Sequence, residues 1–146
     1  MRLGDPLVAP LLAGLSEEYQ RRYGSNDELS RTAEEEFDPP GGLFVVLLDG
    51  AVTAAGGGYR PHGAGSCEVK RMWTNPVYRR RGLAMRVLDA LEEAAGAAGY
   101  GRIVLETGPL QPEAASLYGR RGYRRIPTYG HYPQALGFAI DLCPTA

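Results

Sequence analysis

The chain has 146 residues, of which 44% are hydrophobic and 23% are charged, as expected for a single globular domain spanning residues 1–146. Its formal net charge of −1 provides no overall field to attract nucleic acid or an anionic membrane surface. No stretch approaches the roughly 20 apolar residues that cross a bilayer, and the N-terminus lacks the pattern of a secretory signal, so we expect a cytoplasmic protein. Cys67 and Cys143 fit neither a disulfide framework nor the spacing of metal ligands, so we expect no metal.

The N-terminal part predicts two helices followed by an antiparallel hairpin. Residues 7–23 carry apolar side chains at helical spacing, and residues 28–36 follow a capping segment as a second, shorter helix. After a Pro- and Gly-rich break, residues 43–48 form an apolar run, and Asp49-Gly50 is a hairpin signal. Residues 51–59 return as the partner strand, whose three consecutive glycines indicate a bulge or a close backbone approach.

The remaining elements alternate between strands and helices. Residues 67–73 predict a third antiparallel strand, with Glu68, Lys70 and Met72 on one face and Val69, Arg71 and Trp73 on the other. A helix over 83–98 then leads to a short buried strand over 103–105. A helix over 111–121 and two closing strands, 123–126 and 136–142, complete the chain. This order predicts a mixed α/β domain, in which a strand–helix–strand crossover joins 67–73 to 103–105.

The turn between the third strand and its helix is the strongest functional signal. It carries three consecutive arginines, then Gly82, and Ala84 at the helix start. A helix start presents unpaired N–H groups and partial positive charge, and small residues let a ligand approach the backbone. We therefore expect a phosphate or diphosphate site that holds a phosphorylated cofactor. A solvated basic run is the alternative, whereas the Walker and Rossmann patterns are absent.

Three motifs at these separations resemble the GNAT superfamily of N-acetyltransferases. They are the R-x-x-G-x-A turn at 79–84, the A-x-x-L-Y segment at 114–118, and Gly122-Tyr123. The resemblance covers roughly residue 43 to the end. It implies a central, mostly antiparallel sheet flanked by helices. That sheet is splayed between the family's fourth and fifth strands, here those ending near Trp73 and Glu106. It also implies acetyl-CoA as cosubstrate and a small-molecule or peptide amine as acceptor.

The resemblance also implies a role for individual residues. The pantetheine arm would pair with the backbone of the strand end, and the diphosphate would lie on the turn. In place of the family's common Asn after the fifth strand stands Thr107-Gly108. The implied cofactor-binding residues are Met72, Trp73, Thr74, Arg79, Arg80, Arg81, Gly82, Leu83, Ala84, Ala114 and Tyr118.

Tyr118 is the implied catalytic acid. A phenol near pKa ~10 can protonate a departing thiolate whose conjugate acid is near ~8.5. Because Ala114, Leu117 and Tyr118 share one helical face, the tyrosine could instead belong to the core.

Glu68 is the candidate base for the acceptor amine, since superfamily members often carry a carboxylate near this place. A surface ion pair with Lys70 is the alternative. Glu106 is a second candidate at a strand end, and His131 could line the acceptor pocket, as could Tyr129 and Tyr132 of the same loop.

Two further questions stay open at this stage. The chain could be a CoA-sensing or regulatory binding domain that has lost catalysis, rather than an enzyme that transfers acetyl groups to a primary amine. A homodimer through the last strands is an option, because open sheet edges invite pairing.

Overall fold

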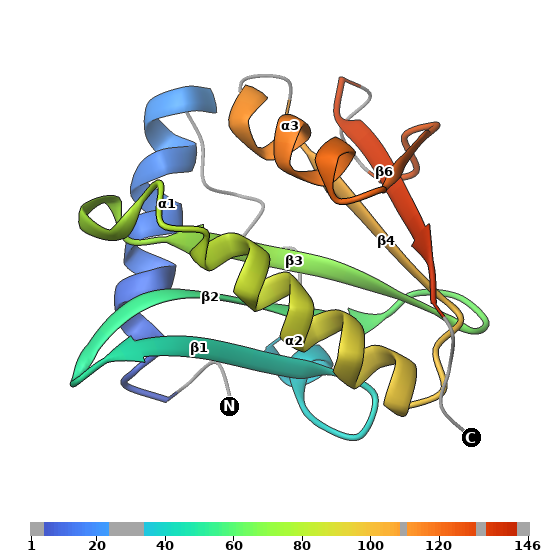
Figure 1. The fold of residues 1–146 in the computed structure, drawn as a ribbon, viewed down its shortest axis with the longest axis horizontal. Helices are drawn as coiled ribbons and strands as arrows, with labels where there is room; N and C mark the ends of the chain where they lie inside the picture. Colours follow the sequence, from blue (N-terminus) through green and yellow to red (C-terminus); the bar gives the residue numbers. More distant parts are fainter. Residues whose placement is uncertain (1–4, 24–33, 109–110, 131–133, 143–146) are drawn as a thin grey trace.

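The computed structural model describes residues 5–23, 34–108, 111–130 and 134–142, which form one six-stranded sheet flanked by helices (Figure 1). The elements are α1 (Ala9–Tyr23), η2 (Glu34–Phe37), β1 (Leu43–Asp49), β2 (Val52–Pro61), β3 (Ser66–Thr74), η3 (Pro76–Tyr78), α2 (Leu83–Ala97), β4 (Arg102–Thr107), α3 (Pro112–Arg120), β5 (Arg124–Ile126) and β6 (Leu136–Asp141). The predicted helix over 28–36 lies partly outside the described residues. Its described end is the 3₁₀ helix η2.

The strand order is β1-β2-β3-β4-β6-β5. β3 and β4 are parallel, and the other neighbouring strands are antiparallel. The parallel pair is joined through α2, which confirms the predicted crossover. The fold is therefore the mixed, mostly antiparallel α/β architecture that the sequence predicts.

The sheet splits between β3 and β4. These strands pair at Ser66–Arg102, Cys67–Ile103 and Glu68–Val104, and beyond that point they diverge (Figure 1). The rest of β3 stays paired with β2 on its other side, and the rest of β4 stays paired with β6. This confirms the expected splay, at the strands ending near Trp73 and Glu106.

Helices cover both faces of the sheet. α2 packs on one face of β1, β2 and β3, and α1 contacts β2 and β3 (Figure 1). The α2 side holds the larger core, which includes Val87, Leu88 and Leu91. The α1 side holds a smaller core of Val8, Leu11, Leu15, Phe37, Phe44 and Trp73.

A β-bulge in β3 interrupts the strict alternation of side chains that the sequence predicted for this strand. Gly56 pairs with Trp73 and Gly58 with Lys70, so Gly57 stands opposite both Arg71 and Met72. Arg71 takes a φ of 62°. The extra residue reverses the faces that follow it. Met72 therefore packs on the α2 side and Trp73 on the α1 side, so placing Met72 with Glu68 was wrong.

Candidate functional site

The turn before α2 leaves the start of that helix open and without a capping side chain. Gly82 is the N-cap of α2 at φ 72° and supplies no capping side chain. Arg80 also has a positive φ, of 65°. A Cβ added to Gly82 would meet no atom within 4 Å, so the space above this backbone is open. The first N–H groups of a helix without a capping side chain are available to a ligand.

Arg79 and Arg81 of this turn have different partners. Arg79 donates from Nε to the Thr74 carbonyl oxygen at 3.4 Å and lies 4.0 Å from a Glu18 carboxylate oxygen. The Arg81 guanidinium lies 5.2 Å from the centre of the Tyr78 ring. All three arginines are exposed, so the turn concentrates positive charge at the start of α2.

The predicted pantetheine strand, Met72 to Thr74, lies beyond the last β3–β4 pair. Trp73 and Thr74 pair with Gly56 and Ala55 of β2, so the opposite edge of this strand faces the gap. The Asn75 N–H then donates to the Ala54 carbonyl at 2.8 Å, which holds the strand end on β2.

Tyr118 lies in α3, which follows the diverging end of β4. Its side chain is buried, and its ring centre lies 5.6 Å from that of Tyr123 and 5.7 Å from that of Phe138. Burial raises the pKa of Tyr118, so the phenol keeps its proton at neutral pH. The residue thus combines a core ring with a hydroxyl that carries its proton. Ala114 packs against the same core.

An ion-pair network fixes the position of α3 on α2. Arg121 donates from Nε and Nη2 to the Glu92 carboxylate at 2.9 and 3.0 Å and also pairs with Asp89. The Tyr123 hydroxyl donates to the same Glu92 at 2.9 Å. This bidentate contact anchors the helix that carries Tyr118.

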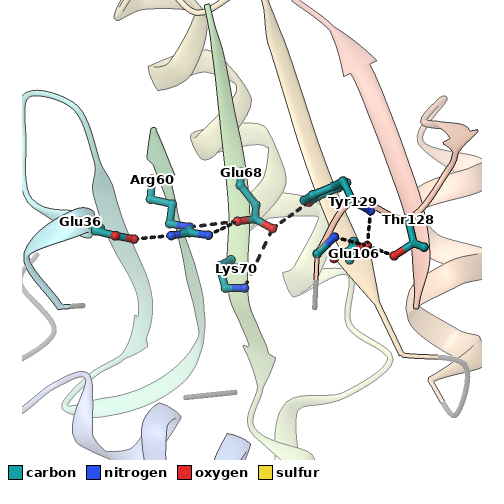
Figure 2. A network of polar contacts seen from close by, with 8 residues as sticks. Glu36, Arg60, Glu68, Lys70, Glu106, Thr128 and Tyr129 are labelled. Atoms are coloured by element: carbon teal, nitrogen blue, oxygen red, sulfur yellow. Dashed lines mark hydrogen bonds and ion pairs between the residues drawn. The ribbon is translucent and has the colours of Figure 1, made fainter. Parts of the chain in front are cut away.

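Glu68 is a buried carboxylate with two hydrogen-bond donors and a nearby ammonium, as Figure 2 shows. Arg60 donates from Nε to Oε1 at 2.9 Å, and the Tyr129 hydroxyl donates to Oε2 at 2.7 Å. The Lys70 ammonium lies 4.0 Å from Oε2, and Arg60 also pairs with Glu36. Because only 5% of the Glu68 side chain is exposed, its contact with Lys70 is not a surface ion pair.

Glu106 holds a loop and is not a free carboxylate. It accepts hydrogen bonds from the Thr128 hydroxyl, from the Tyr129 N–H at 3.0 Å and from the Gly130 N–H at 3.3 Å (Figure 2). The structure therefore brings Glu68, Glu106 and Tyr129 together. His131 and Tyr132 lie outside the described residues.

Sequence reasoning did not identify Arg60 as a partner of Glu68. The register of the β2–β3 pair is the information that would have identified it. Arg60 and Glu68 are cross-strand partners on β2 and β3. Opposite charges directly across an antiparallel pair stabilise each other. A correctly assigned register would therefore have predicted the Arg60–Glu68 ion pair.

Comparison with known proteins identifies the class. A family model described as the Acetyltransferase (GNAT) family matches residues 11–123. The chain therefore belongs to the GNAT family of acetyltransferases.

Particular relatives agree with this assignment. An "IAA acetyltransferase" of Azospirillum brasilense is 34% identical over 100 residues, which cover 68% of this chain and 65% of that protein. The chain thus matches slightly less than two thirds of that relative's length. A GNAT-family acetyltransferase structure from Staphylococcus aureus has a TM-score of 0.80 at 15% identity and covers 97% of both chains. The PaiA N-acetyltransferase of Thermoplasma acidophilum, in complex with coenzyme A, has a TM-score of 0.70 at 14% identity and covers 91% of both chains. At these identities, the two structures show a shared fold.

The described residues also bear on other classes of site. No group of three or more His, Cys, Asp or Glu side chains within them is arranged to hold a metal ion. No helix in the described ranges is long and apolar enough to cross a membrane.

Proposed function

We propose that this protein transfers an acetyl group from acetyl-CoA to a primary amine of a small molecule or peptide by direct attack. The observation that carries the proposal is the divergence of β3 and β4. The end of β3 leads to the uncapped start of α2, and the end of β4 leads to α3 with Tyr118. The start of α2 and the helix that carries Tyr118 thus follow the two strand ends that border the gap.

The residues at this gap fit coenzyme A. The N–H groups at the start of α2, with Arg79, Arg80 and Arg81, would hold the diphosphate, because the space above Gly82 is open. The backbone of Met72 to Thr74 would pair with the pantetheine arm. The coenzyme A complex of the Thermoplasma relative supports this use of the fold. When bound, acetyl-CoA supplies the activated acyl group.

The chemistry assigns a role to each remaining residue. A backbone N–H near Met72 or Trp73 would polarise the thioester carbonyl. Tyr118 would donate its proton to the departing thiolate, and burial keeps the phenol in its protonated form at neutral pH. Glu68, directly or through water, would accept the proton of the amine.

The pKa of the acceptor decides how much the base matters. An alkylamine near pKa ~10.4 costs ~4–5 kcal/mol to deprotonate at neutral pH, whereas an α-amino group near ~8 costs ~1 kcal/mol. Glu68 is therefore more important for an alkylamine acceptor.

A screen of primary amines with detection of the released CoA thiol tests the proposal. We expect Tyr118→Phe to lower kcat by roughly 10²–10⁴-fold, the usual contribution of a general acid, while the dissociation constant of CoA stays unchanged. Tyr100→Phe is the control, because its hydroxyl donates to the Gly41 carbonyl away from the gap. Tight CoA binding without thiol release for any amine would refute the proposal and favour a CoA-sensing domain.

A further inference from the structure

Tyr129 connects the two strands where they separate. Its hydroxyl donates to Glu68 of β3 at 2.7 Å, and its backbone N–H donates to Glu106 of β4 at 3.0 Å. Glu68 belongs to the last β3–β4 pair, with Val104. One residue therefore bridges two carboxylates across the start of the splay (Figure 2).

The loop that carries Tyr129 is held independently of the tyrosine hydroxyl. Glu106 accepts from the Thr128 hydroxyl and from the backbone N–H groups of Tyr129 and Gly130. A Cβ added to Gly130 would lie 2.2 Å from Glu106 Oε1, so the loop also fits closely around this carboxylate. The His62 ring packs edge-on against the Tyr129 ring, with centres 4.8 Å apart. The hydroxyl is thus not needed to hold the loop.

The Tyr129 hydroxyl instead binds one oxygen of the Glu68 carboxylate. Arg60 donates to Oε1, and Lys70 lies 4.0 Å from Oε2, at the limit of an ion pair. Among the described residues, it is Tyr129 that donates a hydrogen bond to Glu68 Oε2. Burial and the neighbouring Glu68 charge raise the pKa of Tyr129, so its hydroxyl remains a donor at working pH.

We propose that Tyr129 is a positioning residue for acyl transfer, whose hydroxyl holds the Glu68 carboxylate and directs it at the point where β3 and β4 part. This inference rests on the proposed function, with Glu68 as the proton acceptor. The charged and titratable groups around Glu68 are Arg60 of β2, Lys70 of β3, Glu36 of η2, Glu106 of β4, and His62 and Tyr129 of the loops. Tyr129→Phe changes none of these other groups, so it isolates the contribution of one hydrogen bond.

Loss of this donor disfavours the charged form of the carboxylate. From the usual strength of a hydrogen bond to a charged group, we expect the acid limb of the kcat/KM profile to move up by about one to two pH units in Tyr129→Phe. Activity then falls most at low pH and recovers at high pH. Tyr100→Phe, which loses a hydroxyl hydrogen bond of the same 2.7 Å length, should leave the profile in place.

A second readout is independent of turnover. Carbon-13 NMR of the labelled glutamate carboxylates, with Glu68→Gln assigning the signal, gives the titration midpoint of Glu68. We expect this midpoint to rise in Tyr129→Phe and to stay unchanged in Tyr100→Phe.

These outcomes separate the two proposals. If no amine supports turnover, the proposed function fails, while the NMR midpoint still decides whether Tyr129 holds Glu68. An unmoved midpoint in Tyr129→Phe overturns the inference. If turnover occurs but Glu68→Gln keeps the wild-type acid limb, or Tyr129→Phe leaves that limb unmoved, the inference is also overturned, and acyl transfer itself stands.

Discussion

Replacing Arg60 with methionine tests how strongly the buried network depends on its central cation. The guanidinium Nε and Nη2 both lie 2.9 Å from Glu68 Oε1, and the Arg60 and Glu68 side chains are 24% and 5% exposed. Removing one partner of a buried ion pair costs about 3–5 kcal/mol, because the other charge is left without compensation. Lys70 and Tyr129 still contact the carboxylate, so we expect a loss near the lower end, about 3 kcal/mol of unfolding free energy.

The double variant Arg60→Met with Glu68→Gln separates the pairing from the loss of packing. With both charges removed, we expect the two substitutions to be less than additive, with a coupling energy of at least about 1.5 kcal/mol. Urea unfolding followed by fluorescence of Trp73, the single tryptophan, measures all four proteins. Arg124→Met is the control, because its ion pair with Asp141 is exposed and should contribute less than about 1 kcal/mol. Strictly additive single substitutions would refute the argument that Arg60 compensates a buried Glu68 charge.

Three other predictions address the cofactor turn, the glycines of the fold and the buried thiol. Gly82→Val should weaken acetyl-CoA binding in calorimetry by crowding the diphosphate, whereas Gly50→Val, at a similar φ of 61°, should not; equal affinities would count against the turn. Gly58→Ala should lose about 1–3 kcal/mol, because its Cβ would lie 2.6 Å from a β1 carbonyl, whereas Gly119→Ala in α3 should gain up to about 1 kcal/mol in open space. Burial raises the pKa of Cys67 from 9.0 to about 12, so its stabilising contribution is complete below pH 9 and declines above it. The stability deficit of Cys67→Ala in urea melts should thus shrink by about 1.4 kcal/mol per pH unit above pH 9, and a constant deficit would contradict this.

The helices, the strand–helix–strand crossover and the splay could be predicted because their signals are local or belong to family motifs. Helix 83–98 carries an apolar stripe, and the glycine before it marks its start, so no distant contact is needed to place it. The bulge at Arg71 and Met72 could not be placed, because it depends on which residue of β2 stands opposite, and alternation along one strand does not contain that information. The predicted faces of Met72 and Trp73 failed for this reason.

The candidate site divides in the same way. The turn at Gly82 follows from local sequence, and its open, uncapped geometry agrees with the expectation. The partners of Glu68 do not follow from local sequence. Arg60 contacts Glu68 because the register of β2 and β3 places them opposite each other, and Tyr129 lies in a loop 61 residues away in the chain. The sequence places the Glu68 carboxylate on a strand, but the tertiary structure determines that it is buried, that Arg60 and Tyr129 donate to it and that the Lys70 ammonium lies nearby.

The short β3–β4 junction has a consequence for the mechanics of the free protein. Two halves of the sheet meet through three residue pairs, so the amides of β3 and β4 that face the gap lack the mutual protection of a continuous ladder. A molecule wedged there would act as a substitute strand, and mass action would add about 2.7 kcal/mol of stability at a hundredfold excess over its dissociation constant. Slowed hydrogen–deuterium exchange confined to these two strand ends would then report occupancy directly, before any acceptor is known.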